Sequence, residues 1–154
     1  MAYTFDFGAV FDYSAQLAQG AGFTLALTAA GAVLGGAIGV AGGVARAWRI
    51  APWHWLFKLY VEAIRNTPFL VQLMFVFFGL PSLGVQINEW QACLLTTVVN
   101  LGAYITEIVR AGVQETPRGQ LEAASALGMG RWALFRHVVL RPALHKVWPA
   151  LSSQ

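Results

Sequence analysis

Three long stretches without a charged residue dominate the hydrophobic pattern of the chain, at residues 13–45, 66–88 and 90–106. The apolar part of the first is residues 23–45, and helical turns from about Leu56 lead into the second. A helix of about 20 residues crosses a bilayer core about 30 Å thick. The pattern therefore predicts transmembrane helices at about residues 23–45, 57–80 and 90–110. Buried soluble helices do not account for three such stretches in 154 residues.

The composition agrees with a lipid-exposed protein. Hydrophobic residues make up 57% of the chain and charged residues 11%, against about 25% charged in soluble domains, and the mean hydropathy is +0.58. A signal peptide does not fit the first stretch, because Asp6 and Asp12 precede it without any Lys or Arg. The net charge of +3 does not indicate nucleic-acid binding, because the basic residues do not cluster with a stacking surface.

The placement of charge predicts the orientation. The segment before the first span carries only the two acids, whereas Arg46, Arg49 and Lys58 lie between the first and second spans. Six basic residues and two acids follow the third span: Arg110, Arg118, Arg131, Arg136, Arg141 and Lys146, against Glu115 and Glu122. Because basic loops stay cytoplasmic, the N-terminus is expected outside a bacterial cytoplasmic membrane and the segment after residue 110 inside. Four tryptophans mark the span ends as an interfacial belt: Trp48, Trp53, Trp55 and Trp90.

Small residues form a ridge on the first span. Gly31, Gly35, Gly39 and Gly43 follow each other at intervals of four residues, and Gly36 and Gly42 are expected to widen the ridge. Small residues allow the backbones of two membrane helices to approach closely. The ridge therefore predicts tight packing against another helix and says nothing about chemistry.

The third span carries a polar stripe. Thr96, Asn100, Tyr104 and Glu107 recur at spacings of four, four and three, which places them on one helical face. Polar groups at membrane depth face protein or a water-filled path. Two interpretations stay open for the stripe: hydrogen bonds between helices, or the lining of a translocation path with Glu107 near its inner end. Asn100 and Glu107 favour the path.

The second region contains a predicted helix interruption. Glu62 and Arg65 are three residues apart and could pair on one face. Pro68 removes a backbone donor and is expected to kink or break the helix. Gln72 then lies in an apolar run. These residues indicate either a helix entry with an ion pair and a kink, or a hinge with a polar group facing the path.

Two short helices are predicted after the third span. Pro117 and Gly119 end the preceding helix, a short helix follows from Gln120, and Gly128 is a natural left-handed terminator. A second amphipathic piece covers residues 131–140 and is broken at Pro142. The pair forms either a compact docking element or an ordinary interfacial helix with a basic face.

The same segment resembles the EAA loop of ABC-importer permeases. The residues that carry the resemblance are Glu122-Ala123-Ala124-x-x-x-Gly128 and Val138-x-Leu140, although Pro142 stands one place late. Upstream, two stretches resemble the permeases for histidine, glutamine, glutamate, arginine and opines. They are Glu62-x-x-Arg65-Asn66-Thr67-Pro68-x-Leu70-Val71-Gln72, with Asn66 in place of Gly, and Gly102-Ala103-Tyr104-x-x-Glu107-x-x-Arg110-x-Gly112-x-Gln114. The resemblance covers about residues 20–150.

This resemblance implies an all-α, polytopic transmembrane bundle of the type I ABC-importer permease kind. Residues 1–19 are then an extracytoplasmic segment, 20–112 the transmembrane domain and 113–154 the cytoplasmic coupling loop. It implies a permease that moves polar amino acids inward by alternating access. Its partners are a separate ATP-binding subunit that uses the ATP, a second permease chain of the same or a related kind, and an extracytoplasmic solute-binding protein. The chain itself is expected to bind membrane lipid, no cofactor and no nucleic acid.

The resemblance implies the coupling residues, whereas the candidates for the path follow from the polar stripe and from the position of Gln72. The coupling residues are Glu122, Ala123, Ala124 and Gly128, and the candidates for the translocation path are Gln72, Asn100, Tyr104 and Glu107. Family members continue with further spans where this chain ends at Gln154, so a truncated chain is expected.

Catalysis within the chain is not expected. The sequence has no Gly-Lys dipeptide for a phosphate-binding loop, its three histidines lack metal-ligand spacing, and a single Cys93 forms no internal disulfide. The alternative to a permease is a small self-assembling channel or a structural membrane protein, which the glycine ridge and the polar stripe would suit equally. A membrane enzyme fits less well, because no nucleophile with a base is present.

Overall fold

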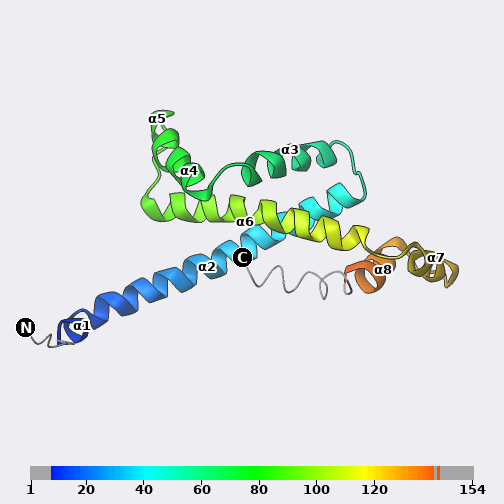
Figure 1. Ribbon diagram of the computed structural model, residues 1–154, viewed down its shortest axis with the longest axis horizontal. Coiled ribbons are helices and arrows are strands. Elements are labelled where there is room, and N and C mark those ends of the chain that lie inside the picture. Colours follow the sequence, from blue (N-terminus) through cyan, green and yellow to red (C-terminus); the bar gives the residue numbers. More distant parts are fainter. Residues whose placement is uncertain (1–7, 141, 143–154) are drawn as a thin grey trace, which may run out of the picture.

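The computed structural model describes residues 8–140 and 142, and in this part of the chain every regular element is helical (Figure 1). The prediction of an all-α fold is confirmed. In chain order the elements are α1 (Gly8–Asp12), α2 (Ser14–Ala47), α3 (Trp53–Arg65), α4 (Phe69–Met74), the π-helix η1 (Phe75–Gly79), α5 (Leu80–Ser82), α6 (Glu89–Gln114), α7 (Arg118–Ala126), α8 (Arg131–Leu134) and the π-helix η2 (Phe135–Leu140).

In the described part of the chain, two helices are long and apolar enough to cross a membrane, namely α2 with 34 residues and α6 with 26 residues. A third crossing is possible if α3 and the segment Phe69–Ser82 together count as one span. The predicted first span lies inside α2, which begins well before residue 23 because polar residues such as Gln16 and Gln19 are also good helix formers. Helix α6 begins at Glu89, where Asn88 and Gln91 form a capping box.

The second predicted span is not one continuous helix. Its two halves, α3 and Phe69–Ser82, are bent by 105° relative to one another, so a span at about residues 57–80 is a broken helix. Pro68 causes the break, since it has no N–H to donate and its extended backbone (ψ 141°) interrupts the helical path. The sequence predicted a kink or break here, and the structure shows a sharp corner from which α4 turns away from α3 (Figure 1).

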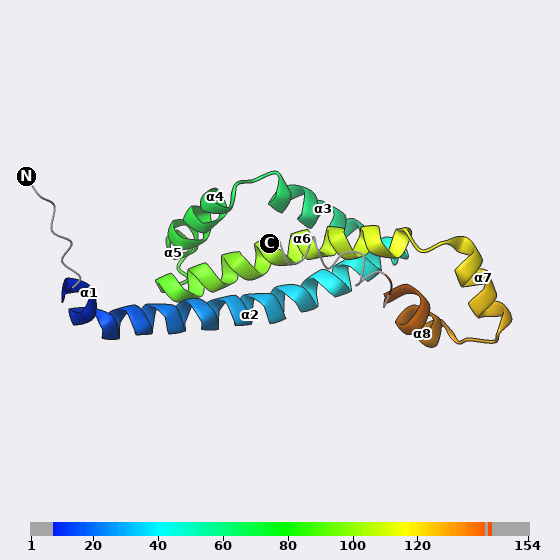
Figure 2. The ribbon, with the colours of Figure 1, turned by 60° about the horizontal axis from the view of Figure 1, so that its bottom comes forward.

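The glycine ridge packs α2 against α6, and the two helices lie side by side in Figure 2. A Cβ atom placed on Gly39 would lie 2.4 Å from Cβ of Ile105, and one on Gly43 would lie 2.6 Å from Cβ of Val109. The prediction of tight packing is confirmed for this stripe. Gly36 does not widen it, because nothing lies within 4 Å of its Cβ position.

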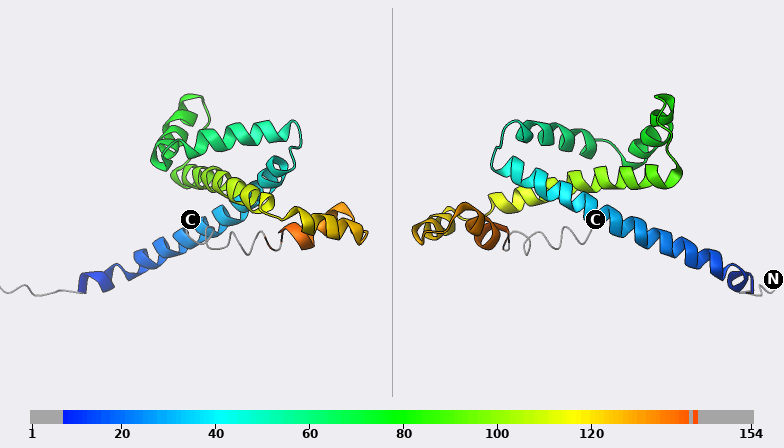
Figure 3. Two further views of the ribbon diagram at one scale, coloured as in Figure 1. Left: turned by 45° about the vertical axis from the view of Figure 1, so that its right-hand side comes forward. Right: turned by 180° about the vertical axis from the view of Figure 1, so that it is seen from behind.

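The elements α7, α8 and η2 form a helical appendage that projects beyond the end of α6 (Figure 3). A cluster of buried residues connects this appendage to the bundle: Ile105, Val109 and Val113 of α6 with Phe135 and Val139 of η2. Phe135 also meets Trp48 edge-on at a ring-centroid distance of 4.9 Å. The appendage is therefore anchored on the ends of α2 and α6, opposite in the molecule to α1 (Figure 1).

Candidate translocation path and coupling segment

The polar stripe of α6 divides into groups with different surroundings. Thr96 is 1% exposed, and its hydroxyl donates a hydrogen bond to the carbonyl of Ala92 one turn earlier, at 2.8 Å. Thr106, which is not among the four predicted stripe residues, is equally buried and donates to the carbonyl of Gly102 at 2.7 Å. Both hydroxyls are satisfied within their own helix, so neither offers a polar group to a path.

Asn100 meets Gln72 across the bundle. Its side-chain amide donates to Oε1 of Gln72 at 3.2 Å. Nε2 of Gln72 in turn donates to two backbone carbonyls at the Pro68 break, those of Ile64 (2.8 Å) and Thr67 (2.7 Å). Gln72 is 8% exposed. In an environment without water, a helix carbonyl that loses its backbone donor needs another donor. Gln72 supplies that donor at the Pro68 break. The hydrogen bond from Asn100 fixes the side chain of Gln72.

Tyr104 and Glu107 lie further along α6 beside three arginines. The guanidinium of Arg65 stands over the Tyr104 ring, 5.4 Å from its centroid. Glu107 forms ion pairs with Arg46 at the end of α2 and with Arg110 one turn onward. Nε of Arg110 donates to Oε1 of Glu107 at 3.0 Å. The expected pair of Glu62 with Arg65 does not form, since Glu62 lies 3.8 Å from Lys58 instead.

A polar cleft of about 380 Å³ opens between the ends of α2 and α3 and the second half of α6. Its lining residues are Arg46, Val61, Glu62, Arg65, Asn66, Tyr104 and Glu107. Of the four predicted path residues, Tyr104 and Glu107 line this cleft, whereas Gln72 and Asn100 form their hydrogen-bonded pair outside it. The cleft has the volume of a site for a small molecule, about 300–1,000 Å³.

The charges in the cleft are mixed. Two guanidinium groups and two carboxylates line it, and Nε of Arg46 is buried without a hydrogen-bond partner in the described structure. In the sequence Arg46 bears only on the predicted orientation, and its contact with Glu107 is not evident there because the two residues are 61 positions apart. The spacing of Glu107 and Arg110 by three residues was the signal that could have identified the local pair.

The predicted coupling residues lie on α7 and the turn after it. Gly128 has φ +74°, as expected for the residue that ends this helix. The amides of Met129 and Gly128 donate to the carbonyls of Ala124 (3.1 Å) and Ser125 (3.0 Å), which is the Schellman arrangement. Helix α7 begins at Arg118, two residues before the predicted Gln120.

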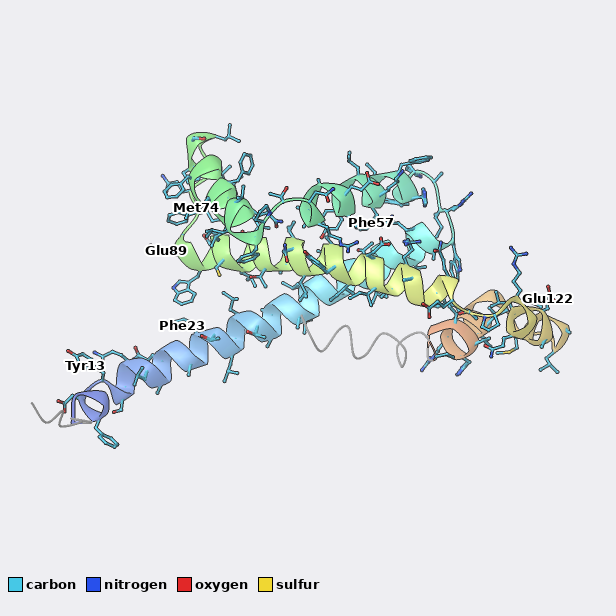
Figure 4. The ribbon with its side chains drawn as sticks, viewed as in Figure 1. Tyr13, Phe23, Phe57, Met74, Glu89 and Glu122 are labelled. Atoms are coloured by element: carbon cyan, nitrogen blue, oxygen red, sulfur yellow. The ribbon has the colours of Figure 1, made fainter. Side chains whose placement is uncertain are left out.

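Burial separates the coupling residues. Ala124 is 4% exposed and faces the rest of the appendage, whereas Glu122 and Ala123 are exposed. Glu122 lies at the far end of the molecule from Tyr13 (Figure 4), and Leu127 beside the turn is 82% exposed. The outer side of α7 and its turn therefore presents a free surface, while the inner side packs against α8 and η2.

Within residues 8–140 and 142, no group of three or more His, Cys, Asp or Glu side chains is placed to hold a metal ion. Two long apolar helices indicate a membrane-spanning protein, and the broken helix and the polar cleft are features expected of a transport subunit. Comparison with known proteins identifies the class further. Residues 31–153 match the model of the family described as binding-protein-dependent transport system inner membrane component, and the chain belongs to this family.

Several relatives align over nearly the whole chain. The glutamine transport system permease protein GlnP of Escherichia coli K12 is 36% identical over 152 residues, which cover 97% of this chain and 69% of GlnP. The arginine transport system permease protein ArtQ of Bacillus subtilis is 32% identical over 150 residues, covering 97% and 68%. A crystal structure of an amino acid ABC transporter with histidines matches with a TM-score of 0.83 at 34% identity, covering 98% of this chain and 71% of that one.

These findings establish a multi-pass inner-membrane permease subunit of an ATP-driven importer. The subunit is a transport component rather than an enzyme, since the ATPase activity of such importers lies in a separate subunit. The alternative of a self-assembling channel is thereby excluded.

Proposed function

We propose that this permease moves polar amino acids into the cytoplasm by alternating access, with its N-terminus outside. The observation that carries the proposal is the mixed-charge cleft at Arg65, Tyr104 and Glu107. Relatives named as permeases for glutamine, arginine and cystine support amino acids as the substrate class.

The chemistry of the cleft suits a zwitterion. A free amino acid carries an ammonium and a carboxylate a few ångströms apart, and the cleft offers groups of both signs. Glu107 is already shared by two arginines, whereas Glu62 is exposed and its contact with Lys58 is long. Glu62 is therefore the better partner for the substrate ammonium, and Arg65, which forms no ion pair with either carboxylate, is the partner for its carboxylate.

We propose that α7 couples ATP hydrolysis in the partner subunit to transport. ATP is used by a separate ATP-binding subunit, and the exposed side of α7 around Glu122 and Ala123 contacts it. Gly128 keeps the turn tight, and Ala124 packs inward so that the helix moves with the bundle. The anchoring cluster of Val109, Val113 and Phe135 transmits that movement to α6, which carries Tyr104 and Glu107.

The remaining partners follow from this mechanism. A second permease chain, the same or related, forms the other wall of the path, and an extracytoplasmic solute-binding protein delivers the amino acid. The chain itself binds no cofactor. Gln72 and Asn100 contribute to the path indirectly, by holding the broken helix that borders it.

The test is uptake of a panel of labelled amino acids into proteoliposomes that contain the permease with its ATP-binding subunit and binding protein. Polar amino acids are expected to accumulate inside the liposomes only when ATP is enclosed there together with the ATP-binding subunit. A matched comparison uses Arg65→Gln and Lys58→Gln, which each remove one positive charge from α3. Loss of uptake with Arg65→Gln alone is expected. Equal uptake in both variants, or an ATP-independent leak in both directions, would contradict the proposal.

A further inference from the structure

A second, smaller pocket lies at the turn between α2 and α3. It measures about 360 Å³ and is lined by Arg49, His54, Trp55 and Lys58. None of these four residues lines the cleft at Glu107. Among the residues that the structure describes, no carboxylate lines the small pocket, so the pocket is electropositive and suited to an anion.

The walls of this pocket are held by specific contacts. Nδ1 of His54 donates to the carbonyl of Arg46 at 3.1 Å, which sets the ring and leaves Nε2 outside that bond. The Trp55 ring meets His54 edge-on at 5.3 Å and lies 5.5 Å below Nζ of Lys58. Lys58 also faces Glu62 at 3.8 Å, but both side chains are about half exposed, so the pair is weak and the ammonium stays available to another anion.

The position of the pocket identifies the source of the anion. Helix α2 ends at Ala47, and the broken helix begins at Trp53, so the turn lies where a membrane-crossing helix leaves the bilayer. Trp48, Trp53 and Trp55 are exposed there by 47%, 55% and 65%. Exposed tryptophan rings are typical of the headgroup level of a membrane. A phosphate held at this depth belongs to a lipid rather than to the bulk solution.

We propose that this pocket binds the phosphate of an anionic phospholipid headgroup in the leaflet that the turn contacts. The planar guanidinium of Arg49 offers two parallel donors to phosphate oxygens, and Lys58 adds a point charge. The Trp55 ring covers the glycerol side of the headgroup. A zwitterionic headgroup is disfavoured, because its own cation would face the basic lining without a carboxylate partner.

The experiment measures lipid binding to the purified full chain in detergent. Dioleoylphosphatidylglycerol and dioleoylphosphatidylcholine are titrated separately, and the retained lipid is counted by native mass spectrometry. The unaltered chain is expected to bind phosphatidylglycerol preferentially. In the double variant Arg49→Gln/Lys58→Gln, its apparent Kd is expected to rise on the order of ten- to thirty-fold.

The matched control is Arg118→Gln/Arg136→Gln, which removes two exposed positive charges from the appendage and is expected to change the Kd by less than about twofold. Equal weakening in both double variants would overturn the proposal in favour of general surface charge. Absence of any preference for phosphatidylglycerol would overturn it too, as would full displacement of the lipid by millimolar inorganic phosphate. If the double variant aggregates, Arg49→Gln and Lys58→Gln singly decide the matter, each with several-fold weakening expected.

Discussion

The guanidinium of Arg46, at the end of α2, forms an ion pair with the carboxylate of Glu107 on α6, 61 residues away in the sequence. Both side chains are largely buried, at 11% and 23% exposure. The pair joins the two longest helices at the end where the appendage is anchored. It also borders the polar cleft, so it connects the candidate path with the candidate coupling segment.

Neutralising the two partners is expected to have unequal effects. Glu107→Gln leaves both Arg46 and Arg110 without their carboxylate and is expected to lower the free energy of unfolding by about 3 kcal/mol. Arg46→Met leaves Glu107 paired with Arg110 and is expected to cost about 1 kcal/mol. Unfolding in detergent micelles measures both, and the double variant completes the cycle. Additive losses would show that the two side chains do not interact.

The glycine ridge predicts a position-specific effect of added methyl groups. Gly39→Ala places a Cβ atom 2.4 Å from Cβ of Ile105, so the helices must separate, at a cost of about 1–3 kcal/mol. Gly36→Ala is the matched control, because its Cβ meets nothing within 4 Å. Thermal unfolding followed by circular dichroism compares the two. Similar melting temperatures would contradict the close approach of α2 and α6.

Gln72 is expected to matter more than Asn100 for stability. Gln72→Leu removes the donor for two carbonyls at the Pro68 break as well as the acceptor for Asn100, and is expected to cost about 2–3 kcal/mol. Asn100→Leu removes one hydrogen bond and is expected to cost about 1 kcal/mol. The same unfolding assay measures both. The reverse order would mean that the corner does not depend on Gln72.

Accessibility separates the two interpretations of the polar stripe. In a Cys93→Ser background, Tyr104→Cys and Glu107→Cys are expected to react with a polar thiol reagent in the assembled transporter, because both positions line the cleft. Thr96→Cys is expected to stay unreactive, since Thr96 is 1% exposed. Protection at all three positions would favour packing between helices over a path.

The turn after α7 is expected to require glycine or asparagine. Gly128 has φ +74° and open space around its Cβ position, so Gly128→Ala is penalised only through the backbone, by about 1 kcal/mol. Gly128→Asn is expected to retain coupling, whereas Gly128→Asp adds a charge beside the ATPase contact and is expected to uncouple transport. Substrate-stimulated ATP hydrolysis is the readout. Gly130→Ala is the control, and unchanged coupling in Gly128→Asp would refute the role of the turn.

Local patterns were sufficient for part of the fold. The spans within α2 and α6, the glycine stripe and the left-handed residue at Gly128 each follow from residue type and spacing over one or two helical turns. The break at Pro68 was equally local, since a missing N–H interrupts any helix. The bend of 105° was not, because its size depends on the packing of α4 against α6 after the break.

The sequence by itself determined that this chain enters a membrane, since long uncharged helices have no other stable surroundings. It also determined family membership, because the short motifs and their order can be recognised in the sequence without a structure. Only the tertiary structure decided which polar residues border the cleft and which hold the corner. The physical reason is that a buried polar group takes the nearest available partner, and for Asn100 and Glu107 those partners lie 28 and 61 residues away, on other helices.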